Sequence, residues 1–168
     1  MILHLRIILD HKKDVFRDIQ LDASKSLEHL HQNIVAAFDL QKGEMASFFL
    51  SNKNWDQEDE IPLLSMQEGS IEMKDISIKD VLKNTESKLL YVQDFLTLWR
   101  FMIEVEDILG QDSSSDLPKT VLSFGNMPKE APNVQFVSEV ETKDDDDPTG
   151  DIFDEFNEFE QFDEFESY

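Results

Sequence analysis

The chain has 168 residues, 40% of them hydrophobic, a formal net charge of −22 and no cysteine. This length and composition predict one domain with a real core and a tail, and the lack of cysteine excludes disulfide frameworks, thiol catalysis and cysteine-based zinc sites. The segment from Glu139 to Tyr168 holds 14 acidic residues and one lysine, so it carries −13 and the remainder carries −9. Because even the body is acidic, the charge argues against direct nucleic-acid binding.

The beginning of the chain predicts a pair of antiparallel strands. Ile2–Leu9 is apolar with His4 and Arg6 at alternate positions, and Val15–Leu21 returns after a polar turn. The first apolar run is too short and too polar for a signal peptide or a membrane span. We therefore expect a cytoplasmic protein with no membrane association.

The next segment predicts the main helix. Ser26 is the expected N-cap, because its hydroxyl can accept a hydrogen bond from an N–H of the first turn, and Lys42-Gly43 is expected to close the helix region. The buried stripe, with helical spacing, should contain Leu27, Leu30, Ile34, Val35 and Phe38. His29 and His31 are two residues apart and point to different faces, so we expect no metal site there.

The middle of the chain predicts short elements. Ala46–Leu50 is a short strand, Ser51–Glu60 a polar loop, and Ile76–Asn84 a short helix. We expect Trp55 to fold back from its loop over the core, and an exposed binding anchor is the alternative. Pro62 restricts its segment to a sheet edge or an irregular conformation. Gln67–Lys74 is expected to be a loop that could hold a short strand at Ser70–Met73, and Leu117–Asn126 gives one more strand.

A β-hairpin over Lys88–Leu109 is the central prediction. Its arms are Leu89–Gln93, which is apolar on both faces, and Trp99–Asp107, which alternates apolar and polar residues. Asp94 suits the start of the turn, because its carboxylate can accept hydrogen bonds from N–H groups two residues on. The remaining apolar turn residues either cover the end of the core, which we favour, or contact a partner: Phe95, Leu96 and Leu98.

Polar residues that could carry chemistry are few. An enzyme would need Asp94, His31 and Tyr91 to converge in one pocket, and we find no catalytic constellation in the sequence. Nucleic-acid binding would need a basic face built from Arg6, Lys12, Lys13 and Arg17, whereas a charged turn beside His11 is the simpler interpretation.

Several segments carry a resemblance to a known family. They are the helix SLEHLHQNIVAAFDL, the short helix SIKDVLK, the strand end YVQDF and the strand WRFMIEVEDIL. Over Met1–Asn126 the chain resembles the plasmid pRiA ORF-3-like family, whose members are also labelled insertion-element passenger, resolvase-like proteins. The family commonly has Gly-Asp where this chain has Leu96 and Thr97, and a histidine where it has Phe101. Asp94 matches the family motif.

The resemblance implies an α+β fold and no known activity. We expect a mixed, mostly antiparallel sheet packed on one main helix, β-grasp-like, in residues 1–128. Residues 129–168 are expected to form a flexible tail, a disordered or partly helical acidic arm. The like charges in a block such as Asp144–Asp147 repel one another, and the block has no apolar side chains to bury.

The acidic arm contains phenylalanines every three residues: Phe153, Phe156, Phe159, Phe162 and Phe165. In an α-helix three successive rings would cover only about 120°, so part of the arm could form helical turns on a partner. We expect the rings to dock in an apolar groove while the carboxylates meet a basic rim. A solubilising tail is the alternative.

A calcium site in the arm is not expected. Asp145, Asp147, Thr149 and Gly150 match the first half of an EF-hand loop, but Phe156 occupies the place that needs a bidentate glutamate. We predict no cofactor and no metal.

The sequence thus predicts a non-enzymatic binding or adaptor protein of unknown process with an unknown protein partner. The arm phenylalanines are the predicted partner-binding residues, and a second predicted surface on the domain consists of Trp55, Asp94, Phe95 and Leu96. The alternative is an accessory protein of mobile elements that acts with, or imitates, nucleic acid.

Overall fold

A computed structural model describes residues 1–110 and 116–130. The strands are β1 (Ile2–Leu9), β2 (Phe16–Asp22), β3 (Ala46–Ser51), β4 (Gln57–Pro62), β5 (Lys88–Gln93), β6 (Trp99–Leu109) and β7 (Lys119–Phe124). The helices are α1 (Leu27–Ala37), the 3-10 helix η1 (Met73–Asp75) and α2 (Ile78–Val81). The predicted acidic arm lies outside the described residues.

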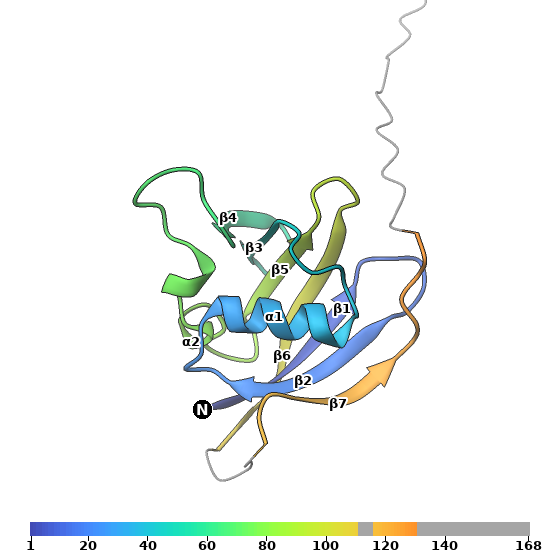
Figure 1. Ribbon diagram of the computed structural model, residues 1–168. Coiled ribbons are helices and arrows are strands. Elements are labelled where there is room, and N and C mark those ends of the chain that lie inside the picture. Colours follow the sequence, from blue (N-terminus) through green and yellow to red (C-terminus); the bar gives the residue numbers. More distant parts are fainter. Residues whose placement is uncertain (111–115, 131–168) are drawn as a thin grey trace, which may run out of the picture. The chain divides into compact units, whose positions relative to one another are not determined.

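The strands form one seven-stranded sheet in the order β4-β3-β5-β6-β1-β2-β7, and all the described strand pairs are antiparallel. Helix α1 crosses one face of this sheet (Figure 1). The fold class is therefore α+β, a mostly antiparallel sheet packed on one main helix, as predicted. Among the described residues no helix is long and apolar enough to cross a membrane.

The core lies between α1 and the sheet because both contribute an apolar face. Leu3, Leu5 and Ile7 of β1 are fully buried, and they pack with the α1 residues Leu27 and Leu30. The predicted cap is present, since the Ser26 hydroxyl accepts the His29 N–H at 3.3 Å. Every second side chain of the strand points to the same face, and helix residues three or four apart share one face. These spacings place the named side chains on surfaces that face each other.

Helix α1 ends before the predicted Lys42-Gly43 stop. Its last helical residue is Ala37, and Asp39 has φ 51. The Leu40 N–H donates to the Val35 carbonyl at 2.9 Å, and the Asp39 N–H donates to the Ala36 carbonyl at 3.4 Å. These two hydrogen bonds form a Schellman motif, with aspartate in the position where glycine is usual. The prediction that Lys42-Gly43 closes the helix was therefore wrong.

One prediction for the middle of the chain was also wrong. Part of the predicted polar loop forms β4, an edge strand whose acidic residues face solvent and whose Ile61 is buried. The Ser47 hydroxyl donates to Glu60 at 2.6 Å and helps to fix β4 on β3. The segment 70–73 does not form a strand and instead leads into η1. Pro62 lies at the sheet edge, as predicted.

The face of the sheet opposite α1 carries a smaller apolar cluster and many polar residues. Phe49, Leu90 and Val92 are buried there beneath the partly buried Trp55 and Leu98. Trp55 thus folds back over the sheet, as expected, and the Lys88 ammonium lies 4.2 Å from the centre of its ring. This helix-free face is partly exposed to solvent, as one face of an antiparallel sheet commonly is.

Candidate functional site

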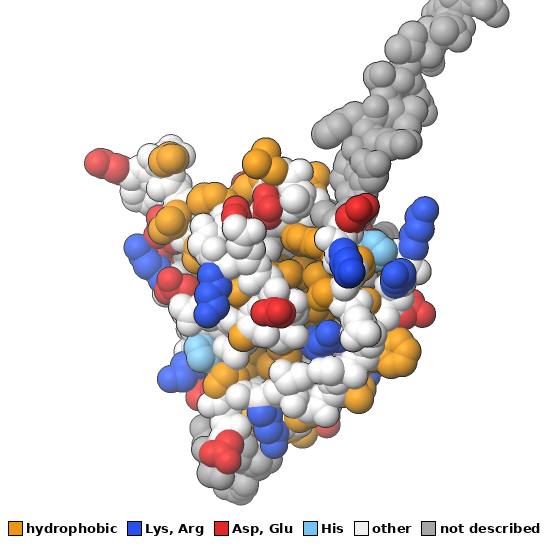
Figure 2. Space-filling model, turned by 45° about the vertical axis from the view of Figure 1, so that its right-hand side comes forward, with side chains coloured by type: hydrophobic (Ala, Val, Ile, Leu, Met, Phe, Trp, Pro, Cys, Tyr) orange, Lys and Arg blue, Asp and Glu red, His pale blue; other side chains and the backbone are white. Residues whose placement is uncertain are grey.

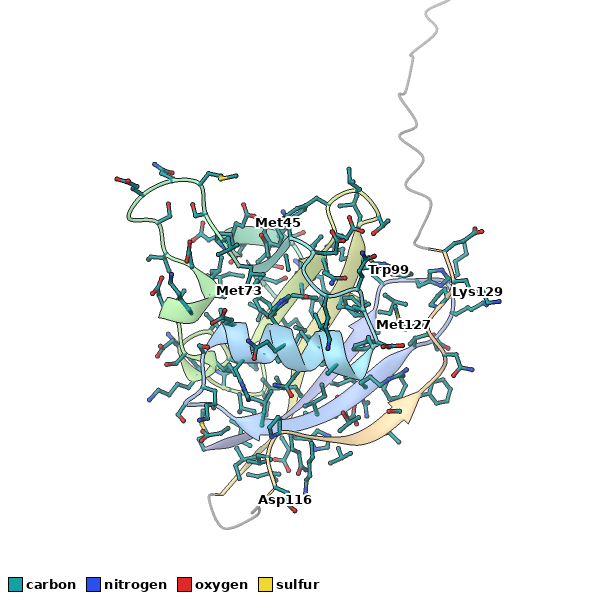
Figure 3. All side chains as sticks on the ribbon, in the orientation of Figure 1. Met45, Met73, Trp99, Asp116, Met127 and Lys129 are labelled. Carbon is teal, nitrogen blue, oxygen red and sulfur yellow. The ribbon has the colours of Figure 1, made fainter. Side chains whose placement is uncertain are left out.

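The turn between β5 and β6 presents apolar side chains to solvent. Leu96 is 96% exposed and Phe95 is 44% exposed. Met45, the residue before β3, is 45% exposed (Figure 3), and its carbonyl accepts the Asp94 N–H at 2.8 Å. We call these three residues, Met45, Phe95 and Leu96, the apolar tip. Hydrophobic side chains also lie at the upper end of the face drawn in Figure 2.

Asp94 fixes the backbone of this turn. Its carboxylate accepts the N–H of Leu96 at 3.0 Å and of Thr97 at 3.4 Å, and the Leu98 N–H donates to the Asp94 carbonyl at 2.6 Å. The hydrogen bonds from the turn hold the pKa of the Asp94 carboxyl below its usual range. Asp94 therefore stabilises the turn through hydrogen bonds to its backbone, as predicted.

The expectation that the turn residues cover the core holds only in part. Leu98 packs on the cluster of the helix-free face, whereas Phe95 and Leu96 point to solvent. Asp94 and Leu98 have φ values of 58° and 55°. Both residues adopt the left-handed conformation, which turns the chain. The sequence does not indicate this conformation, because neither residue is glycine.

His31 and Tyr91 do come together. A hydrogen bond of 2.7 Å joins His31 Nδ1 and the Tyr91 hydroxyl between α1 and β5. Burial lowers the pKa of His31 and raises the pKa of Tyr91. Asp94 is engaged in its own turn, so hydrogen bonding joins only His31 and Tyr91 of the three residues that an enzyme would need.

The two arginines do not form the basic face that nucleic-acid binding would need. Arg17 is 9% exposed, and it donates to the carbonyls of Ala37, Phe16 and Phe124. Its guanidinium carbon lies 5.1 Å from the centre of the Phe38 ring. Arg17 therefore ties the end of α1 to β2 and β7. Desolvation by burial lowers its pKa.

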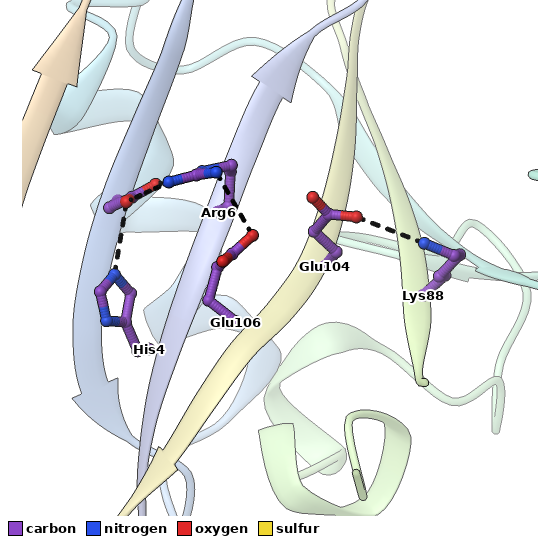
Figure 4. Close-up of polar contacts among 6 residues, drawn as sticks. His4, Arg6, Lys88, Glu104 and Glu106 are labelled. Atoms are coloured by element: carbon purple, nitrogen blue, oxygen red, sulfur yellow. Dashed lines mark hydrogen bonds and ion pairs between the residues drawn. The ribbon is translucent and has the colours of Figure 1, made fainter. Parts of the chain in front are cut away.

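Arg6 is neutralised on the helix-free face of the sheet (Figure 4). Its guanidinium donates twice to the buried Asp18 carboxylate, at 2.9 Å in each bond, and lies 3.5 Å from Glu106. His4 Nε2 lies 3.4 Å from the same Asp18 carboxylate. Nearby, Lys88 pairs with Glu104 at 3.3 Å. The face carries matched charges rather than a free basic patch.

The Asp18 carboxylate should make stability depend on pH. The hydrogen bonds from Arg6 lower the pKa of Asp18, so this pair stabilises the fold above the unfolded pKa near about 3.9. That stabilisation is lost as the pH falls through the lower folded pKa. We expect Asp18→Asn to reduce the free energy of unfolding by about 1–3 kcal/mol at neutral pH.

Urea titrations of both proteins across the acid range test this expectation. The difference between them should be constant at neutral pH and shrink below pH about 4. A difference that stays the same throughout the acid range would show that the Asp18 charge does not stabilise the fold.

The predicted arm residues from Phe153 to Phe165 lie outside the described residues, as does the partial EF-hand pattern. In the part of the chain that is described, no group of three histidine, aspartate or glutamate residues could hold a metal ion.

The fold and the turn thus define an antiparallel α+β domain with an apolar tip. A family model described as plasmid pRiA4b ORF-3-like protein matches residues 1–165. The chain belongs to this family, as the resemblance indicated, and the match continues past residue 128 into the predicted acidic arm.

One solved structure with the same fold is a protein of unknown function, MM3350, from Methanosarcina mazei Go1. It shares 22% identity and has a TM-score of 0.61, covering 73% of this chain and 68% of its own. A comparison with curated proteins finds no similar sequence.

Proposed function

We propose that this protein is a non-enzymatic adaptor of the cytoplasm that binds a protein partner through its apolar tip. The acidic, phenylalanine-rich arm supplies a second docking element in this proposal. The observation that carries it is the exposed Leu96 on a turn that Asp94 holds in one conformation.

The geometry of the tip supports a binding role for two reasons. Exposed apolar residues that gather at one place mark interaction sites more often than scattered ones do. The turn also contains Leu98 with φ 55°, a conformation that costs a non-glycine residue about 1–2 kcal/mol. Strained residues concentrate where function requires them, and this one ends the turn in which Phe95 and Leu96 are exposed.

The polar contacts support a non-enzymatic role. The Asp94 carboxylate already accepts hydrogen bonds from its own turn, and the Tyr91 hydroxyl already pairs with His31. An acid or base that is committed to the fold in this way is poorly placed to exchange protons with a substrate.

An accessory role for mobile elements is the second candidate, and the charge of −13 on residues 139–168 favours it. In this case the acidic arm would imitate nucleic acid in a basic groove of a DNA-binding protein. Such a complex should weaken strongly with added salt, whereas docking of apolar tip residues should withstand it. A salt titration of the captured complex distinguishes the two.

The tip should matter for binding and little for folding. We expect Leu96→Ser to change the free energy of unfolding by no more than about 0.5 kcal/mol, because the side chain is almost fully exposed. We expect the same variant to lose partner binding. The measurement is affinity capture from lysate of the native cell, together with urea unfolding.

Thr97→Ser is the matched control, since it changes the same turn without removing an apolar side chain. A Leu96→Ser variant that is stable and captures the same partner as the natural chain would refute a binding role for the tip.

A further inference from the structure

A groove on the helix-free face of the sheet lies beside the β1–β2 hairpin. Its volume is about 490 Å³. Its apolar lining comes from the four neighbouring strands β6, β1, β2 and β7, and it includes Met102, Ile8, Phe16 and Phe124. The two phenylalanine rings stack with their centres 5.1 Å apart and their planes 15° apart. The groove therefore offers a pair of stacked aromatic rings at the β2–β7 side of this face.

The position of Phe124 in this pair is fixed by the chain that follows it. Gly125 has φ 75°, and a Cβ atom there would collide with the carbonyl oxygen of Asp14. The Phe124 carbonyl also accepts a hydrogen bond from Arg17 at 2.8 Å. The end of β7 is thus held closely against the hairpin, although Phe124 itself stays 52% exposed.

Carboxylates surround the apolar lining. Asp10, Asp14 and Glu104 line the groove together with Arg6. The positive charge of Arg6 is already offset by two further carboxylates, those of Asp18 and Glu106. Arg100 lies 3.9 Å from Asp10, and Lys88 lies 3.3 Å from Glu104. Counting all these pairs, five carboxylates face three cations, so the groove keeps an excess of negative charge. Such a surface attracts cationic groups.

The groove already holds one guanidinium from the chain itself. The guanidinium carbon of Arg6 lies 4.8 Å from the centre of the Phe16 ring while its nitrogens bond Asp18. A flat aromatic face next to a carboxylate is the environment that arginine favours, because the guanidinium can stack and form a fork of hydrogen bonds at the same time. The neighbouring Phe124 ring, with Asp14 beside the groove, offers the same combination unoccupied by Arg6.

We propose that this groove binds an arginine side chain from a basic segment of a partner protein. The guanidinium stacks on the Phe124 ring and bonds the carboxylate of Asp14, whereas Asp10 already pairs with Arg100 at 3.9 Å. The arginine stem covers the apolar floor at Ile8 and Met102. This inference concerns a surface separate from the apolar tip and does not rest on it.

The test uses the full chain and a short glycine–arginine peptide as the probe. The methyl resonances of Ile8 and Met102 report binding in the groove directly, because both side chains line it. We expect saturable shifts of these methyl signals on titration, and a clear weakening of the interaction as salt is raised. A glycine–glutamate peptide of the same length should leave the signals unchanged.

Two variants separate the two halves of the proposed contact. Asp14→Asn removes a carboxylate, and Phe124→Leu removes the ring but keeps an apolar side chain. Each should weaken peptide binding by about threefold or more. Asp59→Asn, on the edge strand β4, removes a carboxylate of the same kind outside the groove lining, and should leave the affinity unchanged.

Three results would overturn the proposal. The arginine peptide could shift only signals of the acidic segment after residue 139, which would make the interaction one of the arm. The glutamate peptide could shift the groove signals equally. The Ile8 and Met102 signals could instead shift with protein concentration in the absence of peptide, which would make a second copy of the chain the occupant.

Discussion

Replacing Phe101 with alanine is expected to lower the free energy of unfolding by about 3–5 kcal/mol. Phe101 is fully buried on the α1 face of β6. Its ring centre lies 4.6 Å from that of Phe38 and 5.8 Å from that of Tyr91. The substitution would leave a cavity between α1 and the central strands, where neighbouring side chains can relax only partly. Urea unfolding measures the loss.

Met102→Ala is the matched control for this experiment. Met102 is the next residue of β6, but it is half-buried on the opposite face. Met102→Ala should lower the free energy of unfolding clearly less than Phe101→Ala does, since fewer contacts are lost. Equal losses for the two variants would contradict the assignment of Phe101 to the core face, and with it the register of the hairpin.

Replacing Arg17 with alanine should lower the free energy of unfolding by about 2–4 kcal/mol, mainly through hydrogen bonds to three carbonyls. One of these is the Ala37 carbonyl at the end of α1, and another is the Phe124 carbonyl at the end of β7. Because Arg17 is almost completely buried, its loss also removes packing against the Phe38 ring.

Thermal and urea unfolding of Arg17→Ala should be compared with those of Lys12→Ala. Lys12 is exposed in the same hairpin, so its replacement should change stability by no more than about 0.5 kcal/mol. If both variants were equally stable, Arg17 would have to be a surface charge, as the sequence interpretation of a charged turn had it.

The regular elements could be predicted where the apolar period was unambiguous. The alternation of Trp99, Phe101 and Ile103 specified β6, and the stripe from Leu27 to Phe38 specified the buried face of α1. The Ser26 cap could also be predicted, because capping depends only on residues that are close in the sequence. Local chemistry decides such features, so one sequence suffices for them.

The errors arose where tertiary contacts decide the structure. β4 is too acidic to be recognised as a strand, and it forms because β3 offers its edge and Ser47 bonds Glu60. The end of α1 depends on Asp39 adopting a positive φ that glycine usually supplies. Arg17 looked like one member of a cationic run, and only the assembled fold places it under α1.

The candidate site was predictable in its chemistry but not in its geometry. The sequence identified Asp94 as a turn-forming residue, and its hydrogen bonds confirm that role. It could not show which apolar turn residues face the core, because the answer depends on the positive φ of Asp94 and Leu98. The groove was missed altogether, because its lining comes from β1, β2, β6 and β7, which are far apart in the sequence.

A quantitative capture of partners from native lysate with four forms of the protein tests whether the apolar tip binds the partner. They are the natural chain, Leu96→Ser, a chain ending at Glu141, and the combination of both changes. If the tip binds the partner, Leu96→Ser sharply reduces recovery of the partner at any salt concentration, and the shortened chain retains at least part of that recovery. Full recovery by Leu96→Ser, with loss only on shortening the chain, would contradict this role of the tip and make the acidic arm the sole binding element.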